Sequence, residues 1–106
     1  MLERRLANGA AGYDERSFLA LTRNGRGVEF APDGLETIRP GQVRGPLFGG
    51  TIAQLTASLG TPFAFAPPDG CVLFLEDVNE RPYKIDRMLT QLRLSGVLGR
   101  ARALVF

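Results

Sequence analysis

The spacing of apolar residues predicts two amphipathic helices in the second half of the chain. Apolar side chains recur at intervals of three and four over residues 50–59 and again over residues 82–94, so each segment has one apolar face. Pro82 suits the first turn of its helix because that position needs no amide hydrogen. A glycine, Gly60 or Gly96, follows each segment and is well placed to end it.

The chain also contains one clear strand and several weaker candidates. Cys71–Leu75 is a continuous apolar run, which is typical of a strand covered on both faces. Ala103–Phe106 is a second apolar run, and Val28–Phe30 and Leu35–Ile38 are shorter candidates on either side of a Pro-Asp-Gly turn signal. Helices and strands together predict an α/β fold, with a mixed sheet flanked by helices.

Two segments contain residues that are typical of the start of a helix. Asp14 is expected to cap a helix that runs to Arg23. Pro46–Thr51 contains two glycines that lead directly into the helix of residues 50–59, and one of its last two residues is the expected N-cap.

Composition and charge narrow the class of protein. Of the 106 residues, 44% are hydrophobic and 23% are charged, which is ordinary for a globular domain. The net charge is only +2 and the basic residues are scattered, which argues against a nucleic-acid partner. No apolar run approaches the ~18 residues of a membrane span, and the N-terminus lacks the apolar core of a signal peptide. We therefore expect a cytoplasmic protein without membrane contact.

Few residues of the sequence could form a metal site or a disulfide. The single cysteine, Cys71, lies in an apolar run and predicts a buried, unreactive thiol. The sequence has no histidine, which excludes a zinc site of the Cys/His type. Three acidic residues within five positions (Glu76, Asp77 and Glu80) could serve a hard metal ion, but no second ligand cluster accompanies them. We expect no metal site.

Glu76 is the strongest candidate for chemistry because it directly follows the strand predicted over Cys71–Leu75. A carboxylate at the end of a buried strand is held rigidly and yet lies beside a loop, which suits a catalytic group. The same position can simply mark the start of a solvated loop. From spacing alone, that plainer interpretation is favoured.

Two blocks of the sequence carry a family resemblance. Leu73–Arg93 is a long ungapped segment, and Pro46–Thr51 followed by Leu59–Phe63 precedes it. Together they resemble the LD-carboxypeptidases, the serine peptidase family that includes the microcin C self-immunity peptidases. The resemblance implies that residues 35–106 are part of the C-terminal domain of a two-domain enzyme. Residues 1–34, which match only loosely, are expected to be a linker and the tail of the preceding domain.

The resemblance implies a catalytic role for Glu76. In this family a serine from the N-terminal domain acts with a glutamate and a histidine from the C-terminal domain, and the glutamate corresponds to Glu76. The full-length enzyme would release a terminal D-amino acid by hydrolysing an L,D-peptide bond in murein peptides, a mechanism that the resemblance implies needs neither a cofactor nor a metal. The chain has no histidine, and Ser17, Ser58 and Ser95 lie in no nucleophile-like turn. We therefore expect a fragment cut on both sides of its catalytic glutamate and inactive alone.

Other interpretations stay open. The alternative function is a non-catalytic binding or assembly module, since an unpaired strand at Leu104–Phe106 could recruit another copy into a homo-oligomer. Asp77, Asp86 and Arg87 also match the family block, where loop-fixing hydrogen bonds or a salt bridge are favoured over substrate contact. Thr51 stands where many relatives carry asparagine. If that asparagine only caps the helix, threonine substitutes well for it. If it touches the active site, the change weakens the case for Gly49–Thr51 as a functional element.

Overall fold

The computed structural model describes residues 14–23 and 34–106 of the chain, which divides into two compact units, Met1–Pro40 and Gly41–Phe106. The first unit contains α2 (Glu15–Arg23), whose start is capped by Asp14 as predicted. Asp14 Oδ1 accepts hydrogen bonds from the amides of Arg16 and Ser17 at 3.1 and 3.3 Å, and its Oδ2 accepts one from the Ser17 hydroxyl at 2.6 Å. These bonds satisfy amides that the helix itself leaves unpaired.

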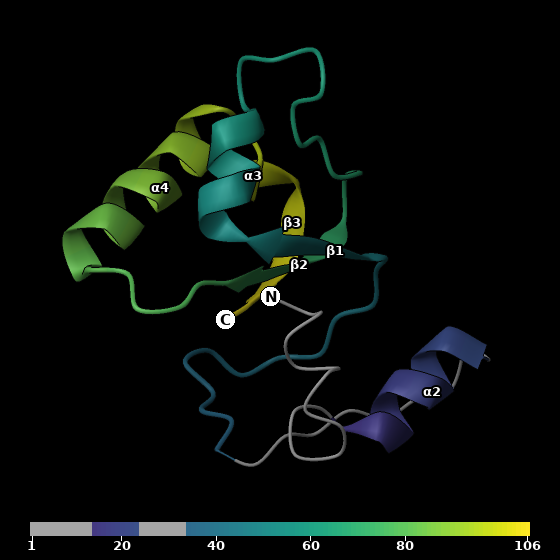
Figure 1. Cartoon of the computed structure of the whole chain (residues 1–106). Coiled ribbons are helices and arrows are strands. Elements are labelled where there is room, and N and C mark those ends of the chain that lie inside the picture. Colours follow the sequence, from purple (N-terminus) through teal and green to yellow (C-terminus); the bar gives the residue numbers. More distant parts are fainter. Residues whose placement is uncertain (1–13, 24–33) are drawn as a thin grey trace. The chain divides into compact units, whose positions relative to one another are not determined.

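The second unit holds the sheet. Along the chain its elements are β1 (Leu47–Thr51), α3 (Ile52–Ser58), β2 (Cys71–Glu76), α4 (Pro82–Leu94), the short 3₁₀ helix η2 (Leu98–Arg100) and β3 (Ala101–Val105) (Figure 1). The three strands lie in the order β1-β2-β3, and both neighbouring pairs are parallel.

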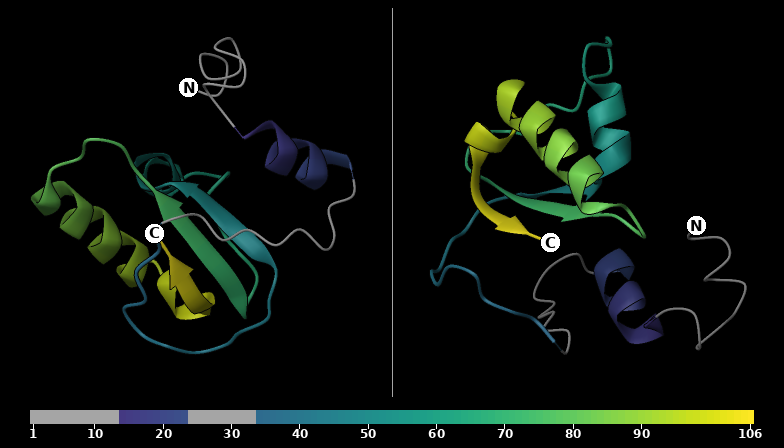
Figure 2. Two further views of the ribbon diagram at one scale, coloured as in Figure 1. Left: turned by 90° about the horizontal axis from the view of Figure 1, so that it is seen from below. Right: turned by 90° about the vertical axis from the view of Figure 1, so that its left-hand side faces the viewer.

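Both connections between the strands pass over the same face of the sheet. α3 links β1 to β2 and α4 links β2 to β3, and the two helices contact each other in one layer above the strands (Figure 2). The expected α/β class is confirmed. Because helical crossovers rather than tight hairpins join the strands, the sheet in the described residues is parallel instead of mixed.

The core lies between this helical layer and the sheet. Its fully buried apolar side chains are Ile52, Cys71, Leu73, Leu75, Leu92 and Val97. Three of them alternate along β2, so that Cys71 is the buried thiol that the sequence predicts. The face expected to be covered on the other side of β2 is instead partly open, and Phe74 there is 39% exposed. Strand register places the apolar residues of this open sheet face together: Leu47, Val72, Phe74, Ala103 and Val105.

The ends of the helices follow the sequence signals. α4 begins at Pro82 in its first turn, and Gly96 follows its C-cap residue with φ 82°. α3 ends in the same manner, with Gly60 at φ 80° just after its C-cap residue. Glycine suits both positions because the left-handed region costs it no steric penalty.

β1 was not expected as a strand, because its two glycines lower strand propensity. Gly49 is nevertheless required there: a Cβ atom on it would overlap the carbonyl oxygen of Phe74, its register partner on β2. The glycine thus permits a close approach of the two backbones.

The strand predicted over Leu35–Ile38 is wrong. These residues form no strand, and Ile38 is 89% exposed, so no core packing favours an extended pairing. Its expected partner, Val28–Phe30, lies outside the described residues. Within the described ranges, no helix is both long and apolar enough to cross a membrane.

Candidate active site

Glu76 and Thr51 end two neighbouring strands at the same edge of the sheet. β1 and β2 are parallel and in register, so the last residue of each, Thr51 and Glu76, are paired partners. The Thr51 hydroxyl donates a hydrogen bond to Oε1 of Glu76. Both side chains are half-buried. Because parallel strands fix this edge, the carboxylate is held by the sheet rather than by a loop.

The second oxygen of Glu76 stays open. Across residues 14–23 and 34–106, its carboxylate has no hydrogen-bond partner other than Thr51 and forms no ion pair. No side-chain oxygen of this part of the chain is both buried and unpaired. Oε2 therefore retains contact with solvent, and the carboxylate is not neutralised by an arginine.

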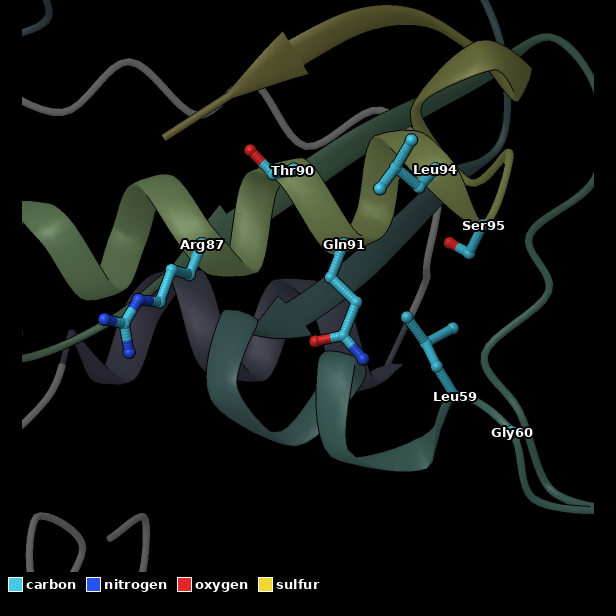
Figure 3. A pocket seen from close by; sticks show the side chains of 7 residues that line it. All are labelled: Leu59, Gly60, Arg87, Thr90, Gln91, Leu94 and Ser95. Carbon is cyan, nitrogen blue, oxygen red and sulfur yellow. The ribbon is translucent and has the colours of Figure 1, made fainter.

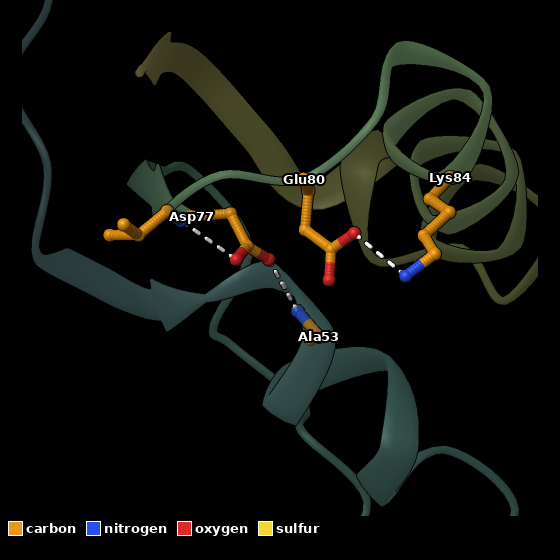
Figure 4. Close-up of polar contacts among 5 residues, drawn as sticks. Ala53, Asp77, Glu80 and Lys84 are labelled. Carbon is orange, nitrogen blue, oxygen red and sulfur yellow. Dashed lines mark hydrogen bonds and ion pairs between the residues drawn. The ribbon is translucent and has the colours of Figure 1, made fainter.

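Asp77, the next residue, points to a different element. Its Oδ2 accepts a hydrogen bond from the Ala53 amide in the first turn of α3 at 3.3 Å, and its Oδ1 accepts one from the Val78 amide at 2.8 Å (Figure 4). These are the loop-fixing bonds that the sequence interpretation favoured over substrate contact. They tie the end of β2 to the start of α3.

The loop that follows is held at its far end as well. Asn79 adopts a left-handed backbone with φ 61°, a conformation that asparagine tolerates better than most residues. Glu80 then forms an ion pair with Lys84 at 3.1 Å (Figure 4), and the hydrogen bond that the Lys84 ammonium donates to Glu80 raises the pKa of Lys84 above its usual 10.5. The segment between β2 and α4 is thus anchored on both sides of Asn79.

Arg87 is exposed on α4 and, among the described residues, forms no ion pair with Glu76. Its guanidinium sits 5.3 Å from the centre of the Tyr83 ring, a cation–π contact. It also lines a shallow depression between α4 and the end of α3 (Figure 3), formed by Leu59, Gly60, Arg87, Thr90, Gln91, Leu94 and Ser95. Glu76 is not among the residues that line this depression. Asp86 forms no ion pair within the described ranges.

The three serines take part in local hydrogen bonds. Ser17 Oγ donates to the Asp14 carboxylate, Ser58 Oγ donates to the Leu55 carbonyl at 2.7 Å, and Ser95 Oγ donates to the Leu92 carbonyl at 3.0 Å. Such bonds are ordinary for serine in and beside helices. In the part of the chain that is described, no group of three metal-ligating side chains comes together. The arrangement offers one open carboxylate at a strand end, and the catalytic role of Glu76 stays a prediction.

Sequence reasoning missed the pairing of Thr51 with Glu76. Because β1 was not predicted as a strand, Thr51 was not expected to lie beside the end of β2. The signal that could have found it is the shared layout of the two blocks, Pro46–Thr51 and Leu73–Glu76, each an apolar stretch that ends in a polar residue before a helix or loop. In a parallel sheet such ends meet at one edge.

Known carboxypeptidases are similar to this chain in sequence. Residues 44–106 match the LD-carboxypeptidase C-terminal domain. A probable murein peptide carboxypeptidase of Bacillus subtilis is 48% identical over 64 residues, which are 60% of this chain and 20% of that protein. A putative carboxypeptidase of Streptomyces coelicolor is 43% identical over 96 residues, which are 84% of this chain and 31% of that protein.

A solved structure agrees in fold as well. The crystal structure of muramoyltetrapeptide carboxypeptidase from Oxalobacter formigenes superimposes with a TM-score of 0.52 at 43% identity, covering 57% of this chain and 20% of that one. The chain thus spans between a fifth and a third of the length of these relatives. Since the domain match extends over more than half of its residues, the chain belongs to the LD-carboxypeptidase family, whose C-terminal domain it shares over residues 44–106.

Proposed function

We propose that Glu76 is the triad carboxylate of a serine carboxypeptidase that hydrolyses murein peptides. The observation that carries the proposal is the Glu76 carboxylate at the strand end, with one oxygen bound by Thr51 and the other open. A triad carboxylate needs such a free oxygen, because it must accept a hydrogen bond from the catalytic imidazole. The names of the Bacillus and Oxalobacter relatives support murein peptides as the substrate class.

In the proposed mechanism the serine hydroxyl attacks the carbonyl of an L,D-peptide bond while the imidazole takes its proton. Glu76 holds the imidazole in the tautomer that can accept this proton and stabilises the imidazolium that forms. The imidazole then protonates the leaving amine, and a terminal D-amino acid departs, leaving the rest of the peptide as an ester on the serine. A water molecule, deprotonated by the same imidazole, attacks this ester, and the imidazole returns the proton to the serine oxygen as the shortened peptide leaves. The 106 residues contain no histidine, so the imidazole, like the nucleophile, comes from polypeptide outside this sequence. We infer that the isolated chain is inactive and that the full enzyme works in the cytoplasm.

A chimera tests the role of Glu76. Residues 44–106 replace the matching segment of the Bacillus relative, and the chimera is assayed for release of the terminal D-amino acid from an L,D-tetrapeptide. Glu76→Gln keeps the shape of the side chain but removes its charge, and it should lower kcat by about 10³–10⁴-fold, as expected when a triad carboxylate is replaced by its amide. Binding of the peptide, read from KM, should change far less.

Glu80→Gln is the matched control, because it makes the same change four residues away in an ion pair with Lys84. It should leave kcat within a few-fold of the parent chimera. A Glu76→Gln chimera that is as active as the Glu80→Gln chimera would refute the proposed role. Turnover of the tetrapeptide by the 106-residue chain alone would refute the inference that it lacks a complete triad.

A further inference from the structure

The first turn of α3 is capped by a side chain other than that of its N-cap residue. Thr51 is the N-cap residue of this helix, and a threonine there ordinarily uses its own side-chain oxygen to accept an amide hydrogen of the first turn. Here the Thr51 side chain makes no capping hydrogen bond, and its hydroxyl is directed to Glu76 instead. The amide that Thr51 leaves, that of Ala53 at the second helical position, is bound by Asp77 from the neighbouring strand.

We propose that Asp77 is a positioning residue for Glu76: by capping α3 from the end of β2, it leaves the Thr51 hydroxyl free to hold the carboxylate. The importance of this arrangement for catalysis rests on the proposed role of Glu76. The geometry itself does not, since it concerns only the contacts among Thr51, Ala53, Glu76 and Asp77.

Two successive acidic residues can serve two purposes because side chains alternate across a strand. Leu75 is buried in the core under the helices, so Glu76 lies on the opposite face of the sheet, with its register partner Thr51. The next residue, Asp77, returns to the helical side and reaches the first turn of α3. Its second oxygen binds the Val78 amide, which fixes the direction of its carboxylate. Asp77 is therefore oriented at both oxygens.

A hydroxyl can donate one hydrogen bond and accept others, but in the rotamer that donates to Glu76 the Thr51 oxygen does not cap α3. If the Ala53 amide lost its acceptor, Thr51 could satisfy it by rotating into the usual capping position, because an unpaired first-turn amide favours any nearby side-chain oxygen. That rotation would break the bond to Glu76 and release the carboxylate to sample other rotamers. Removal of Asp77 should therefore affect Glu76 through Thr51, not by direct contact.

The test measures the Glu76 side chain in the 106-residue chain by NMR. Three-bond couplings from its Cγ to its own amide nitrogen and carbonyl carbon report the χ1 populations. A single rotamer is expected in the wild type. Asp77→Ala should produce rotamer-averaged couplings, whereas Asp77→Asn, whose amide oxygen can still cap α3, should restore the wild-type values. Asp86→Ala is the matched control, since it removes the same charge from an exposed site on α4.

Thr51 provides the second arm, which can overturn the proposal even if Asp77→Ala fails to fold. Thr51→Val should average the Glu76 couplings and Thr51→Ser, which keeps the hydroxyl, should not. In the Thr51→Val background, Asp77→Ala should add no further averaging. The proposal is overturned if Thr51→Val leaves a single Glu76 rotamer, or if folded Asp77→Ala does. If the chimera assay refuted the catalytic role of Glu76, the couplings expected here would be the same. A failure of the proposed function and a failure of this inference can therefore be told apart.

Discussion

The Thr51 hydroxyl donates a hydrogen bond to the Glu76 carboxylate across the ends of two parallel strands. Each residue is the last of its strand, so the separation of the two side chains is set by the hydrogen-bond ladder between β1 and β2. Candidate catalytic groups carried by strands are placed more reproducibly than groups carried by loops. The sheet of this unit therefore fixes the position of the Glu76 carboxylate, and the stability of the sheet determines how precisely that carboxylate is placed.

The packing of β2 predicts a stability difference between two leucines that are register partners. Leu73 is fully buried at 0% exposure, while Leu104, its partner on β3, is 47% exposed. Leu73→Ala should lower the free energy of unfolding by about 2–5 kcal/mol, because it removes buried methyl groups and leaves a cavity. Leu104→Ala should cost clearly less, since its side chain is already half in water. Urea unfolding of the two variants measures both losses, and equal losses would contradict the assigned core.

The Asp14 cap predicts a pH dependence of α2. The hydrogen bond from the Ser17 hydroxyl, followed by that from the Ser17 amide, holds the pKa of the Asp14 carboxyl below its ordinary 3.8. A carboxyl whose pKa is lower in the folded helix than in the unfolded chain stabilises the helix fully at pH values above its unfolded-state pKa. That stabilisation is lost as the pH falls through its folded-state pKa. Helical chemical shifts over Glu15–Arg23 should therefore weaken below about pH 3.8.

Asp14→Asn is the control for this titration, because asparagine caps a helix without a charge. In that variant the shifts of α2 should stay nearly constant over the same pH range. If the wild type and Asp14→Asn follow the same curve, another group is responsible for the change.

The open sheet face predicts self-association at high concentration. Phe74 lies in the middle of its apolar residues, whereas Phe63 is in the loop before β2 and is 89% exposed. Contiguous apolar patches drive association more strongly than isolated apolar side chains. Phe74→Thr should therefore reduce the concentration-dependent rise in light scattering, and Phe63→Thr, the same change at a more exposed site, should not. A larger effect of Phe63→Thr would show that exposure of single side chains is the cause.

Local signals predicted the helices well. Proline at the start of α4, glycine after α3 and α4, and the cap at Asp14 all act within a few residues, so the sequence expresses them directly. The apolar run of β2 was equally readable, and Glu76 proved to be its last residue.

Features that depend on distant contacts could not be predicted in the same way. The propensity of Gly49 argues against a strand, and only the nearby backbone of Phe74, its partner on β2, explains why a glycine is needed in this strand. For the same reason the partner of Glu76 was hidden, because Thr51 reaches it through sheet register and not through sequence proximity. The acceptor for the Ala53 amide likewise comes from a residue 24 positions away.

Gly49 is a sensitive position in β1 although it has no side chain of its own. It lies two residues before Thr51, where a single added methyl group would wedge β1 away from Phe74. The displacement would travel along the strand and draw the threonine out of reach of Glu76. Even alanine at position 49 would therefore disturb the pairing of Thr51 with Glu76, although it changes no charge, polarity or hydrogen-bonding capacity.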